Sequence, residues 1–398
     1  MQYQTAVNRR YDIDALRVLA FALLILYHCA MFYVADWGWH VKSGYVSEWL
    51  QYPMILVNRW RMPLLFLISG LAVNFLLRRT GAGDFAWSRF KRLFVPLLFG
   101  MAVIVPPQAY LQAISNSAFA GNYAQFLVAY FTFQPWPAGA FDGSHIGVTW
   151  NHLWYLPYLL TYSLLLAAAL PLLNSKPGLW LRDRFRGLRG MKLALLPAVP
   201  LVLYTWFMTF PSTHDLITDW ENHAKYFTVF LYGYWMGADA GLWAELKRMR
   251  WPMLVAALAS FAVFMLLLTL RTSASPALFR SGYDFFEYLY QWIMLLAIFG
   301  WSFHLLNRPF RWLPYATEAV YPWYVLHQTI TVVAGYQLAK FSLGPVVEPA
   351  LVIAAAIAGC FVLHEFVIRR VNILRPLFGL KAAAVAPPGI ENLAAETR

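Results

Sequence analysis

The chain has few charged residues for its length. Only 13 % of its 398 residues are Asp, Glu, Lys or Arg, whereas 60 % are hydrophobic. Soluble domains carry about 25 % charged and about 45–50 % apolar residues, so a soluble fold would lack the polar side chains needed to cover its surface. The excess of apolar residues indicates that lipid solvates much of this chain.

Cysteine is also scarce, and both Cys29 and Cys360 lie inside apolar runs. Two such cysteines form neither a disulfide framework nor a zinc site. The first apolar run, residues 16–34, is not followed by a small-residue cleavage site, so we expect it to stay as a membrane helix rather than to be removed as a signal peptide. The net charge is +12, but Lys and Arg fall in short loops between apolar runs. This pattern indicates membrane topology and no nucleic-acid partner.

Apolar runs of about the length of a bilayer-crossing helix occur ten times. They cover residues 15–35, 53–77, 93–116, 150–173, 193–210, 226–243, 253–270, 285–306, 316–338 and 347–368. The sequence therefore predicts an all-α polytopic membrane protein with ten transmembrane helices. The shorter aromatic run 123–134 is predicted to be interfacial or re-entrant. We expect one membrane domain over residues 1–381 and a disordered cytoplasmic tail over 382–398.

Basic residues are distributed unevenly between alternate loops. One set of segments, which includes both ends of the chain, holds 24 of the 31 Lys and Arg residues. The alternate loops hold only Lys42, Lys225, Arg271, Arg280 and Lys340. The positive-inside rule places the first set in the cytoplasm. With an even number of spans, both termini are predicted to be cytoplasmic, in a bacterial inner membrane.

Three ionisable residues in or beside the first span are candidate site residues. Arg17 and His28 are eleven residues apart, which puts them on one helix face about 16 Å apart along the axis. Asp14 lies one turn before Arg17 and can pair with it. A charge inside a membrane span is costly and usually faces a cavity or a partner. The alternatives are a positive-inside anchor for Arg17 and a core histidine bonded to a neighbouring helix for His28.

The second span contains two arginines, Arg59 and Arg61. A buried arginine needs an anion or an acidic side chain as its partner. One alternative is that the arginines snorkel to the outer interface, which suits Arg59 better than Arg61. Another is that Arg61 pairs with an acid from a different span, such as Glu318 or Asp239.

Later spans add further candidates. The run 88–92, with Arg89 and Arg92, enters the third span from the cytoplasm, and charge alone does not separate a topology signal from a phosphate site. His152 and Trp154 open the fourth span at the outer face. In the ninth span, near the middle of the bilayer, His327 needs a partner. No metal cluster, paired carboxylates or nucleophile elbow is visible, and Ser69 before Gly70 is interpreted as a packing site.

These motifs resemble the acyltransferase 3 family of membrane acyltransferases. The family hallmark is an Asp followed by Arg, ten residues and His in the first span, which Asp14, Arg17 and His28 match. A Phe-rich stretch that ends in Ser-Gly occurs at 64–70, and a basic run that ends in Arg-Leu-x-x-Pro occurs at 89–96. A late Tyr-x-x-x-His pattern is met loosely by residues 321–327.

Within that family, the chain resembles the glucan biosynthesis protein C branch. The chain shares with it Arg61-Met62 before the Phe-rich stretch and His152-Leu153-Trp154 at the start of the fourth span. The resemblance implies transfer of an acyl group from cytoplasmic acyl-CoA to a sugar hydroxyl at the outer side. In that branch the acyl group is succinyl, from succinyl-CoA, and the acceptor is an osmoregulated periplasmic glucan.

The chemistry that the resemblance implies assigns a role to each candidate. A thioester donor needs a base near the attacking hydroxyl and cations on its phosphates. His28, with Asp14 and Arg17, is the predicted catalytic group. The predicted donor-binding residues are Arg17, Arg89, Arg92 and Arg61. The predicted acceptor-binding residues are Arg59, His152, Trp154, Tyr324 and His327.

Two other functions fit the same residues. A carrier would use the buried arginines to move an organic anion or a lipid-linked sugar, although the chain shows no internal repeat of the kind frequent in transporters. A non-catalytic anchor of a glycan-assembly complex would show neither thioester turnover nor donor binding. Besides the bilayer, acyl-CoA and a glycan, self-association into a homo-oligomer is compatible with the sequence.

Overall fold

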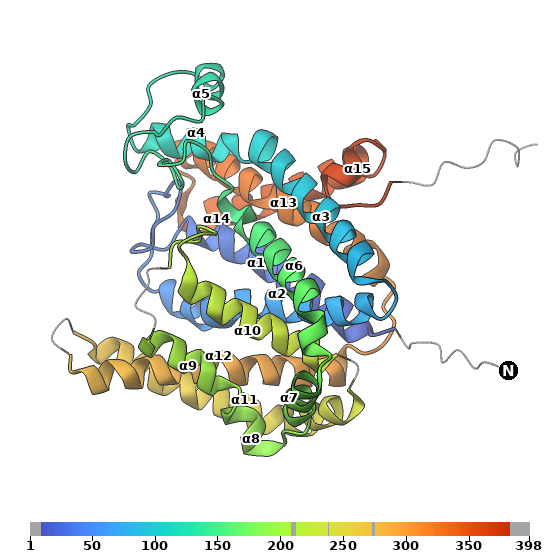
Figure 1. The fold of residues 1–398 in the computed structure, drawn as a ribbon. Helices are drawn as coiled ribbons and strands as arrows, with labels where there is room; N and C mark the ends of the chain where they lie inside the picture. The colour runs from blue at the N-terminus through green and yellow to red at the C-terminus, as the bar shows by residue number, and fades with distance from the viewer. Residues whose placement is uncertain (1–8, 208–211, 238, 273–274, 383–398) are drawn as a thin grey trace, which may run out of the picture.

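The computed structural model describes residues 9–207, 212–237, 239–272 and 275–382. The predicted disordered tail, apart from its first residue, lies outside the described residues. Within these ranges the chain forms helices and no β-strand, which confirms the all-α prediction; Val34 and Ser47 form an isolated β-bridge. Figure 1 shows a bundle whose long helices run roughly parallel or antiparallel.

The first half of the chain contains six α-helices and two irregular turns, a π-helical and a 3₁₀ one, among the described residues. They are α1 (Tyr11–Met31), α2 (Gln51–Leu77), α3 (Ala82–Phe99), a π-helical turn (Gly100–Ile104), α4 (Pro106–Ser115), α5 (Tyr123–Tyr130), a 3₁₀ turn (Asn151–Trp154) and α6 (Tyr155–Leu173). The short α5 is closed at its start by a capping box, because Asn122 and Gln125 each bond the other's backbone N–H.

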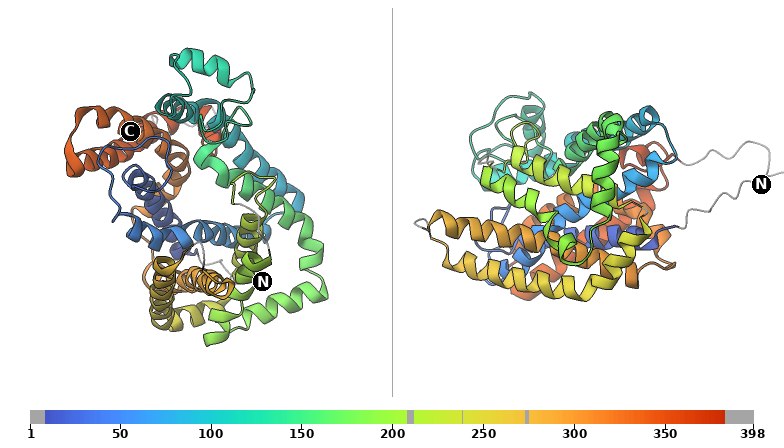
Figure 2. Two further views of the ribbon diagram at one scale, coloured as in Figure 1. Left: turned by 90° about the vertical axis from the view of Figure 1, so that its left-hand side faces the viewer. Right: turned by 60° about the horizontal axis from the view of Figure 1, so that its bottom comes forward.

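The second half adds the remaining helices. They are α7 (Lys176–Arg186), α8 (Gly190–Leu195), α9 (Ala198–Phe207), α10 (Trp220–Met236), α11 (Ala240–Leu270), α12 (Ala277–Leu305), α13 (Leu313–Leu338), a 3₁₀ turn (Ala339–Phe341), α14 (Gly344–Val362), a π-helical turn (Leu363–Ile368) and α15 (Leu374–Leu377). Figures 1 and 2 show α11 and α12 side by side along one flank, with α1 and α2 in the interior.

Among the described residues, six helical segments are long and apolar enough to cross a membrane, or seven if the bent pair of residues 82–104 and 106–115 forms one span. A helix lies in each of the ten predicted spans, but α10, α12 and α13 are not among the six. The 17 residues of α10 are few for a crossing. Polar and aromatic side chains are frequent in α12 and α13. Ten crossings therefore stay a prediction.

The boundary predicted for the sixth span was wrong. A single span was expected over 226–243, but α10 ends at Met236 and α11 begins at Ala240. Gly237 has φ +38°, a conformation that suits glycine and ends the helix. The side chain of Asp239 then caps α11 by accepting a hydrogen bond from the Leu242 N–H at 2.8 Å.

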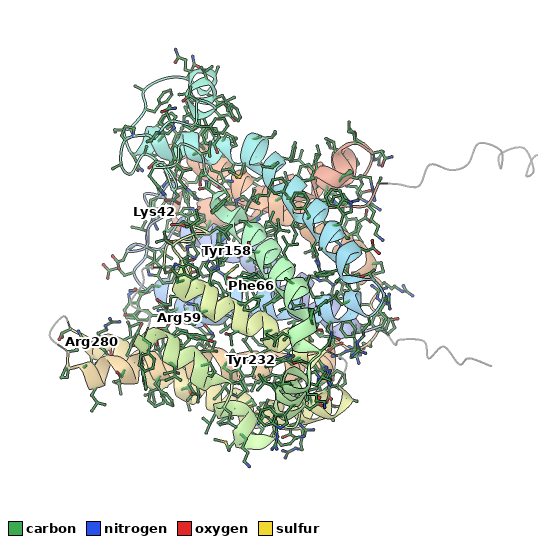
Figure 3. The ribbon with its side chains drawn as sticks, in the orientation of Figure 1. Lys42, Arg59, Phe66, Tyr158, Tyr232 and Arg280 are labelled. Atoms are coloured by element: carbon green, nitrogen blue, oxygen red, sulfur yellow. The ribbon has the colours of Figure 1, made fainter. Side chains whose placement is uncertain are left out.

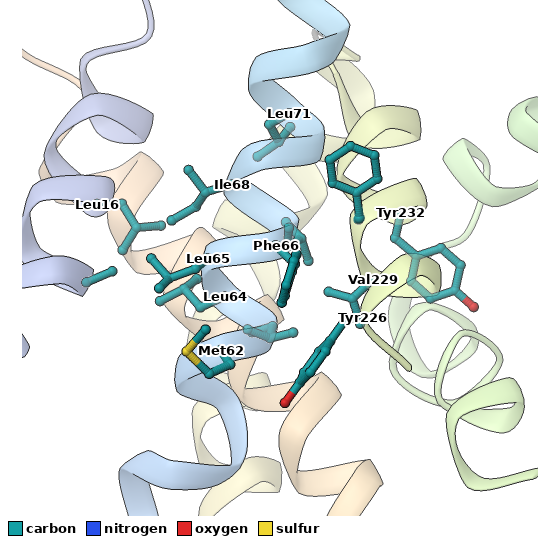
Figure 4. Packing of buried hydrophobic residues seen from close by; sticks show 14 of the residues in the cluster. Leu16, Met62, Leu64, Leu65, Phe66, Ile68, Leu71, Tyr226, Val229 and Tyr232 are labelled. Carbon is teal, nitrogen blue, oxygen red and sulfur yellow. The ribbon is translucent and has the colours of Figure 1, made fainter. Parts of the chain in front are cut away.

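Close backbone contact joins α2 to α10 at the centre of the bundle. A Cβ atom on Gly70 would lie 1.9 Å from the Phe230 carbonyl oxygen, and one on Gly233 would lie 2.1 Å from the Leu67 carbonyl oxygen. Small residues at such positions let membrane helices approach closely. Figure 4 shows Phe66 of α2 beside Tyr226 of α10 at this contact, and the two rings stack at 4.8 Å. The contact fixes the side of α2 that faces α1.

The two sets of loops that the sequence distinguished lie at opposite ends of the bundle. Figure 3 shows Lys42 and Arg280, from the loops predicted to be external, at the same end of the bundle. At the opposite end, α15 (Figure 1) is flanked by basic residues, and Glu318 of α13 pairs with Arg369 and Arg375 at 3.5 and 3.4 Å. This separation agrees with the loop charges, while the cytoplasmic placement of both termini stays a prediction.

We expect labelling of single cysteines to report the orientation. The native Cys29 and Cys360 are buried. Gly44 has open space where a Cβ would lie, and Gly81 has only the Asp84 carboxylate at 4.0 Å, so both positions accept a cysteine. With a membrane-impermeant maleimide added to spheroplasts, Gly44→Cys should be labelled and Gly81→Cys should be labelled only after lysis. The reverse result would invert the predicted topology.

Candidate functional site

A cavity lined by arginines opens at the α15 end of the bundle. Its volume is about 610 Å³, and its walls come from α1, α2, α3, α6 and α13. Six arginines line it: Arg9, Arg10, Arg17, Arg79, Arg89 and Arg92. Asp14 is the one carboxylate among the described lining residues. Arginine forks bind phosphate and carboxylate groups in a bidentate manner, so the cavity suits an anion with several phosphates.

Asp14 holds Arg17 in place, as the sequence predicted. Its Oδ1 accepts a hydrogen bond from Arg17 Nη2 at 2.6 Å, and its Oδ2 accepts from Arg9 at 3.0 and 3.1 Å. Arg89 forms no ion pair in the described part of the chain, and its buried Nε has no hydrogen-bond partner. The structure brings Arg17, Arg89 and Arg92 into one cavity. Their role as donor ligands stays a prediction.

An aromatic layer closes the inner end of this cavity. Phe21 and Tyr155 are part of its lining, and Tyr324 lies behind them, with ring centroids 5.3 and 6.1 Å from theirs. The Tyr155 hydroxyl is 2.6 Å from Ser69 Oγ and also donates to the Leu65 carbonyl. His28 does not line the cavity in this structure. The sequence prediction did not include Tyr155, although it follows the predicted Trp154 directly.

Beyond the aromatic layer, His28 of α1 meets His327 of α13. His28 Nδ1 lies 2.8 Å from His327 Nε2, and the two rings stack with centroids 5.0 Å apart. His327 is fully buried, whereas His28 is partly exposed. The sequence predicted both residues but did not pair them. A signal was available, because two helices each carried an unpartnered histidine in the bilayer interior.

Backbone carbonyls fix the proton positions in this pair. His327 Nδ1 lies 2.8 Å from the Tyr324 carbonyl oxygen and 3.2 Å from that of Trp323. A carbonyl only accepts, so His327 Nδ1 carries the proton and its Nε2, in the neutral ring, is an acceptor. His28 must then donate from Nδ1. The lone pair of His28 Nε2 then has no partner among the described residues, which is the state that a general base requires.

The histidines around this pair use both of their ring nitrogens. His152 Nε2 donates to the Val325 carbonyl at 3.1 Å, and Gln108 lies 3.4 Å from its Nδ1. His40 donates from Nδ1 to Gln112 and accepts at Nε2 from Gln328, both at 2.8 Å. In the described part of the chain, no group of His, Cys, Asp or Glu is arranged to hold a metal ion. Among the four histidines of this cluster, His28 is therefore the one with a ring nitrogen left for a substrate.

A bend between α3 and α4 places Gln108 in this network. The π-helical turn at 100–104 and Pro106 bend the chain by 42°. The Thr329 hydroxyl donates to the Ile104 carbonyl that the turn presents, and Gln108 donates to Thr329 at 2.5 Å. Gln108 also accepts from Gln328 of α13 at 3.0 Å. The bend thus ties α4 to the helix that holds His327.

The structure buries His152, which the sequence placed at the outer mouth. Its side chain is 6 % exposed, and its ring lies 5.2 Å from that of His327. The reason is that this side chain packs between α4 and α13, where Gln108 lies 3.4 Å from its Nδ1, the Val325 carbonyl accepts from its Nε2, and the Tyr324 ring lies 5.8 Å away. Trp154 lies closer to the external loops, with its ring 4.4 Å from that of His214 and 5.8 Å from that of Tyr226.

Arg61 is a buried cation without an acidic partner in the described residues. Its guanidinium stacks 3.5 Å from the ring centre of Tyr27, the residue before His28. Its buried Nε and Nη1 have no hydrogen-bond partner. The acids considered as partners are bound elsewhere, because Glu318 pairs with Arg369 and Arg375, and Asp239 caps α11. Arg61 is an electrostatic neighbour of His28 and of His327.

Arg59 differs from Arg61 because it has an acidic partner. Its Nη1 lies 3.1 Å from Glu287 Oε1 of α12, and its Nη2 is 3.5 Å from the Tyr283 hydroxyl. The arginine is therefore held between helices rather than free for a ligand. Figure 3 places it toward the end of the bundle that carries Lys42 and Arg280.

Sequence comparison assigns the family of this chain. The acyltransferase 3 profile, described as an acyltransferase domain, matches residues 10–365. The chain belongs to the acyltransferase 3 family. The predicted family is thereby confirmed, and the protein is an acyltransferase with several apolar helices of membrane-spanning character. The matched range contains every candidate residue named above, from Asp14 to His327.

Curated relatives support the predicted branch of the acyltransferase 3 family. Glucans biosynthesis protein C of Escherichia coli strain SMS-3-5 / SECEC is 26 % identical over 162 residues, and that of strain K12 / DH10B is 25 % identical over the same length. Each match covers 40 % of this chain and 38 % of the relative. The chain thus aligns with less than half the length of these relatives. No solved structure matches it.

Proposed function

We propose that this acyltransferase moves a succinyl group from cytoplasmic succinyl-CoA to a hydroxyl of a periplasmic glucan, in the bacterial inner membrane. The observation that carries the proposal is the oriented pair of His28 and His327, deep in the bundle beyond an arginine-lined cavity. A base with a free nitrogen and a site for several phosphates are what transfer from an acyl-CoA requires. The names of the relatives connect the chain with glucan biosynthesis.

The chemistry is one acyl transfer from sulfur to oxygen. The acceptor hydroxyl donates its proton to His28 Nε2 as its oxygen attacks the thioester carbonyl. The C–O bond of the new ester forms, the C–S bond breaks, and the CoA thiolate takes up the proton to leave as a thiol. His327 accepts the hydrogen bond from His28 Nδ1 throughout, so the imidazole keeps its orientation while it carries the proton.

The geometry of α1 suits a donor that enters from the cytoplasm. Arg17 lies at the cavity, and His28 lies about 16 Å farther along the same helix face. In the proposal the arginines hold the CoA phosphates, and the extended pantetheine arm spans the distance to His28. The path requires the side chains of Phe21, Tyr155 and Tyr324 to move, because they separate the cavity from the histidine pair.

Arg61 supports a donor with a free carboxylate. Taking the terminal carboxylate of a succinyl group into a membrane cavity without a cation would be very costly. Arg61 is buried beside Tyr27 with two unbonded guanidinium nitrogens, whereas Arg59 already pairs with Glu287. In the proposal Arg61 binds the succinyl carboxylate. On the outer side, the aromatic residues Trp154 and Tyr226 stack on the sugar acceptor.

Replacement of His28 tests the catalytic assignment. His28→Ala should lower kcat for acyl transfer by ~10²–10⁴-fold, the usual contribution of a general base, without a change in donor Kd. His327→Ala should lower kcat by about 100-fold, because the base loses its orientation. His364→Ala is the control, since His364 is also buried but has no hydrogen bond at either nitrogen. If His28→Ala transfers acyl groups at the rate of the unmodified protein, His28 is not the base. If the unmodified protein does not turn over a thioester at all, the carrier function is favoured.

Replacement of the cavity arginines tests the phosphate site. Arg17→Ala and Arg89→Gln should each weaken CoA binding, measured by calorimetry in detergent, by about tenfold or more, because each removes a charge-assisted hydrogen bond. Arg17→Lys should restore binding only in part, since lysine lacks the planar fork. Arg308→Gln removes the same charge from a loop outside the cavity and should leave Kd unchanged. Equal Kd values for all variants would place the phosphate site elsewhere.

Donor competition tests the role of Arg61. Arg61→Gln should weaken binding of succinyl-CoA by ~2–3 kcal/mol more than binding of acetyl-CoA, because only the succinyl group brings a carboxylate to be paired. Arg59→Gln is the matched control on the same helix and should affect both donors equally. An equal loss for the two donors in Arg61→Gln would make that arginine structural and would argue against a dicarboxylic donor.

A further inference from the structure

A second basic cavity lies on the other side of α2 from the first. Its volume is about 320 Å³, and its walls come from the ends of α2, α6 and α10, from the turn at 78–82 and from α7. No residue lines both cavities. The polar and charged residues of the second cavity are Asn74, Arg78, Thr80, Asn174, Arg182, Arg186 and Tyr234.

The positive charge of this second cavity is only partly neutralised within the described residues. Arg182 pairs at 2.8 Å with Asp183, whose side chain is 62 % exposed and does not line the cavity. Arg186 donates to the Trp235 carbonyl at 2.7 Å. Burial and the neighbouring charge of Arg182, with that of Arg78 as a smaller effect, lower the pKa of Arg186, and Asp239 opposes this. An anion among the arginines would relieve their repulsion.

The surroundings of the cavity belong to a membrane surface. The α7 helix, which supplies Arg182 and Arg186, presents Trp180 outward with 59 % of its surface exposed. Leu172, near the end of α6, is 68 % exposed. Exposed tryptophan is typical of the bilayer interface, and exposed leucine suits acyl chains. The cavity lies among the loops predicted to be cytoplasmic, where the leaflet contains anionic lipids.

We propose that this second cavity binds the phosphate of an anionic phospholipid from the cytoplasmic leaflet. Arg78, Arg182 and Arg186 surround the phosphodiester, and the acyl chains run over the apolar residues at the end of α6. Basic cavities between membrane helices on this side suit lipid head groups. The site is separate from the one proposed for the donor, and it stands whether or not the chain transfers a succinyl group.

Lipid retention in native mass spectrometry tests the site. The full-length protein would be purified in phosphatidylcholine nanodiscs and titrated with phosphatidylglycerol. The double variant Arg182→Gln, Arg186→Gln should bind phosphatidylglycerol more weakly, by about fivefold for each arginine removed. Arg186→Lys keeps the charge and should retain most of the binding. Inorganic phosphate, added in a parallel titration, should not displace the lipid at equal concentration.

A matched control separates the cavity from general surface charge. The double variant Lys176→Gln, Arg184→Gln removes two charges from the same helix, at exposed positions that do not line the cavity. It should bind phosphatidylglycerol as the wild type does. An equal loss in both double variants would overturn the proposal, because nonspecific attraction would then explain the binding. Displacement by inorganic phosphate, or no preference for phosphatidylglycerol over phosphatidylcholine, would also overturn it.

Discussion

The hydrogen bond between His28 and His327 joins α1 to α13 at the centre of the candidate site. It forms inside an apolar bundle, where a polar group that lacks a partner is costly. Consecutive hydrogen bonds satisfy both rings. His327 Nδ1 donates to two backbone carbonyls of α13, and His327 Nε2 accepts from His28 Nδ1. Because every link has a fixed donor and acceptor, the free nitrogen of His28 is a consequence of the fold.

The same constraint explains why the two arginines of α2 differ. Arg59 meets Glu287 on α12 and so belongs to the framework of the bundle. Arg61, two residues later, points toward Tyr27 and leaves two guanidinium nitrogens unbonded. In a soluble protein, water would complete those bonds. In a membrane protein an unbonded buried cation is rare and is a candidate ligand-binding group. Two positions along α2 turn the side chain by about 200°, so Arg59 faces α12 and Arg61 faces α1.

Backbone geometry determines how the helices that carry the candidate site are placed. The contact of Gly70 and Gly233 with opposite backbones sets how closely α2 approaches α10, and a larger side chain at either position would force the helices apart. The 42° bend after α3 sets the direction of α4, and it thereby places Gln108 against α13. The bend lies near the histidines, because Gln108 contacts both His152 and Gln328, so local backbone irregularity contributes to the candidate site.

Periodicity and composition in the sequence were sufficient for the all-helical fold and for the positions of most helices, since an apolar run of about 20 residues has few alternatives in lipid. Local spacing also predicted that Asp14 binds Arg17, one helical turn away. The family followed from short motifs. The sequence failed at Gly237, where one predicted span proved to be parts of two helices, because hydropathy does not register a glycine with positive φ.

The tertiary structure decided which residues meet. His28 and His327 are 299 positions apart in the chain, and no periodicity relates them. The burial of His152 depends on its contacts with α4 and α13, and the unpaired state of Arg61 depends on where the acids of other helices lie. Sequence specifies what each helix can bury, because that depends on its own side chains. Which groups become partners depends on the packing between helices, which only the folded chain defines.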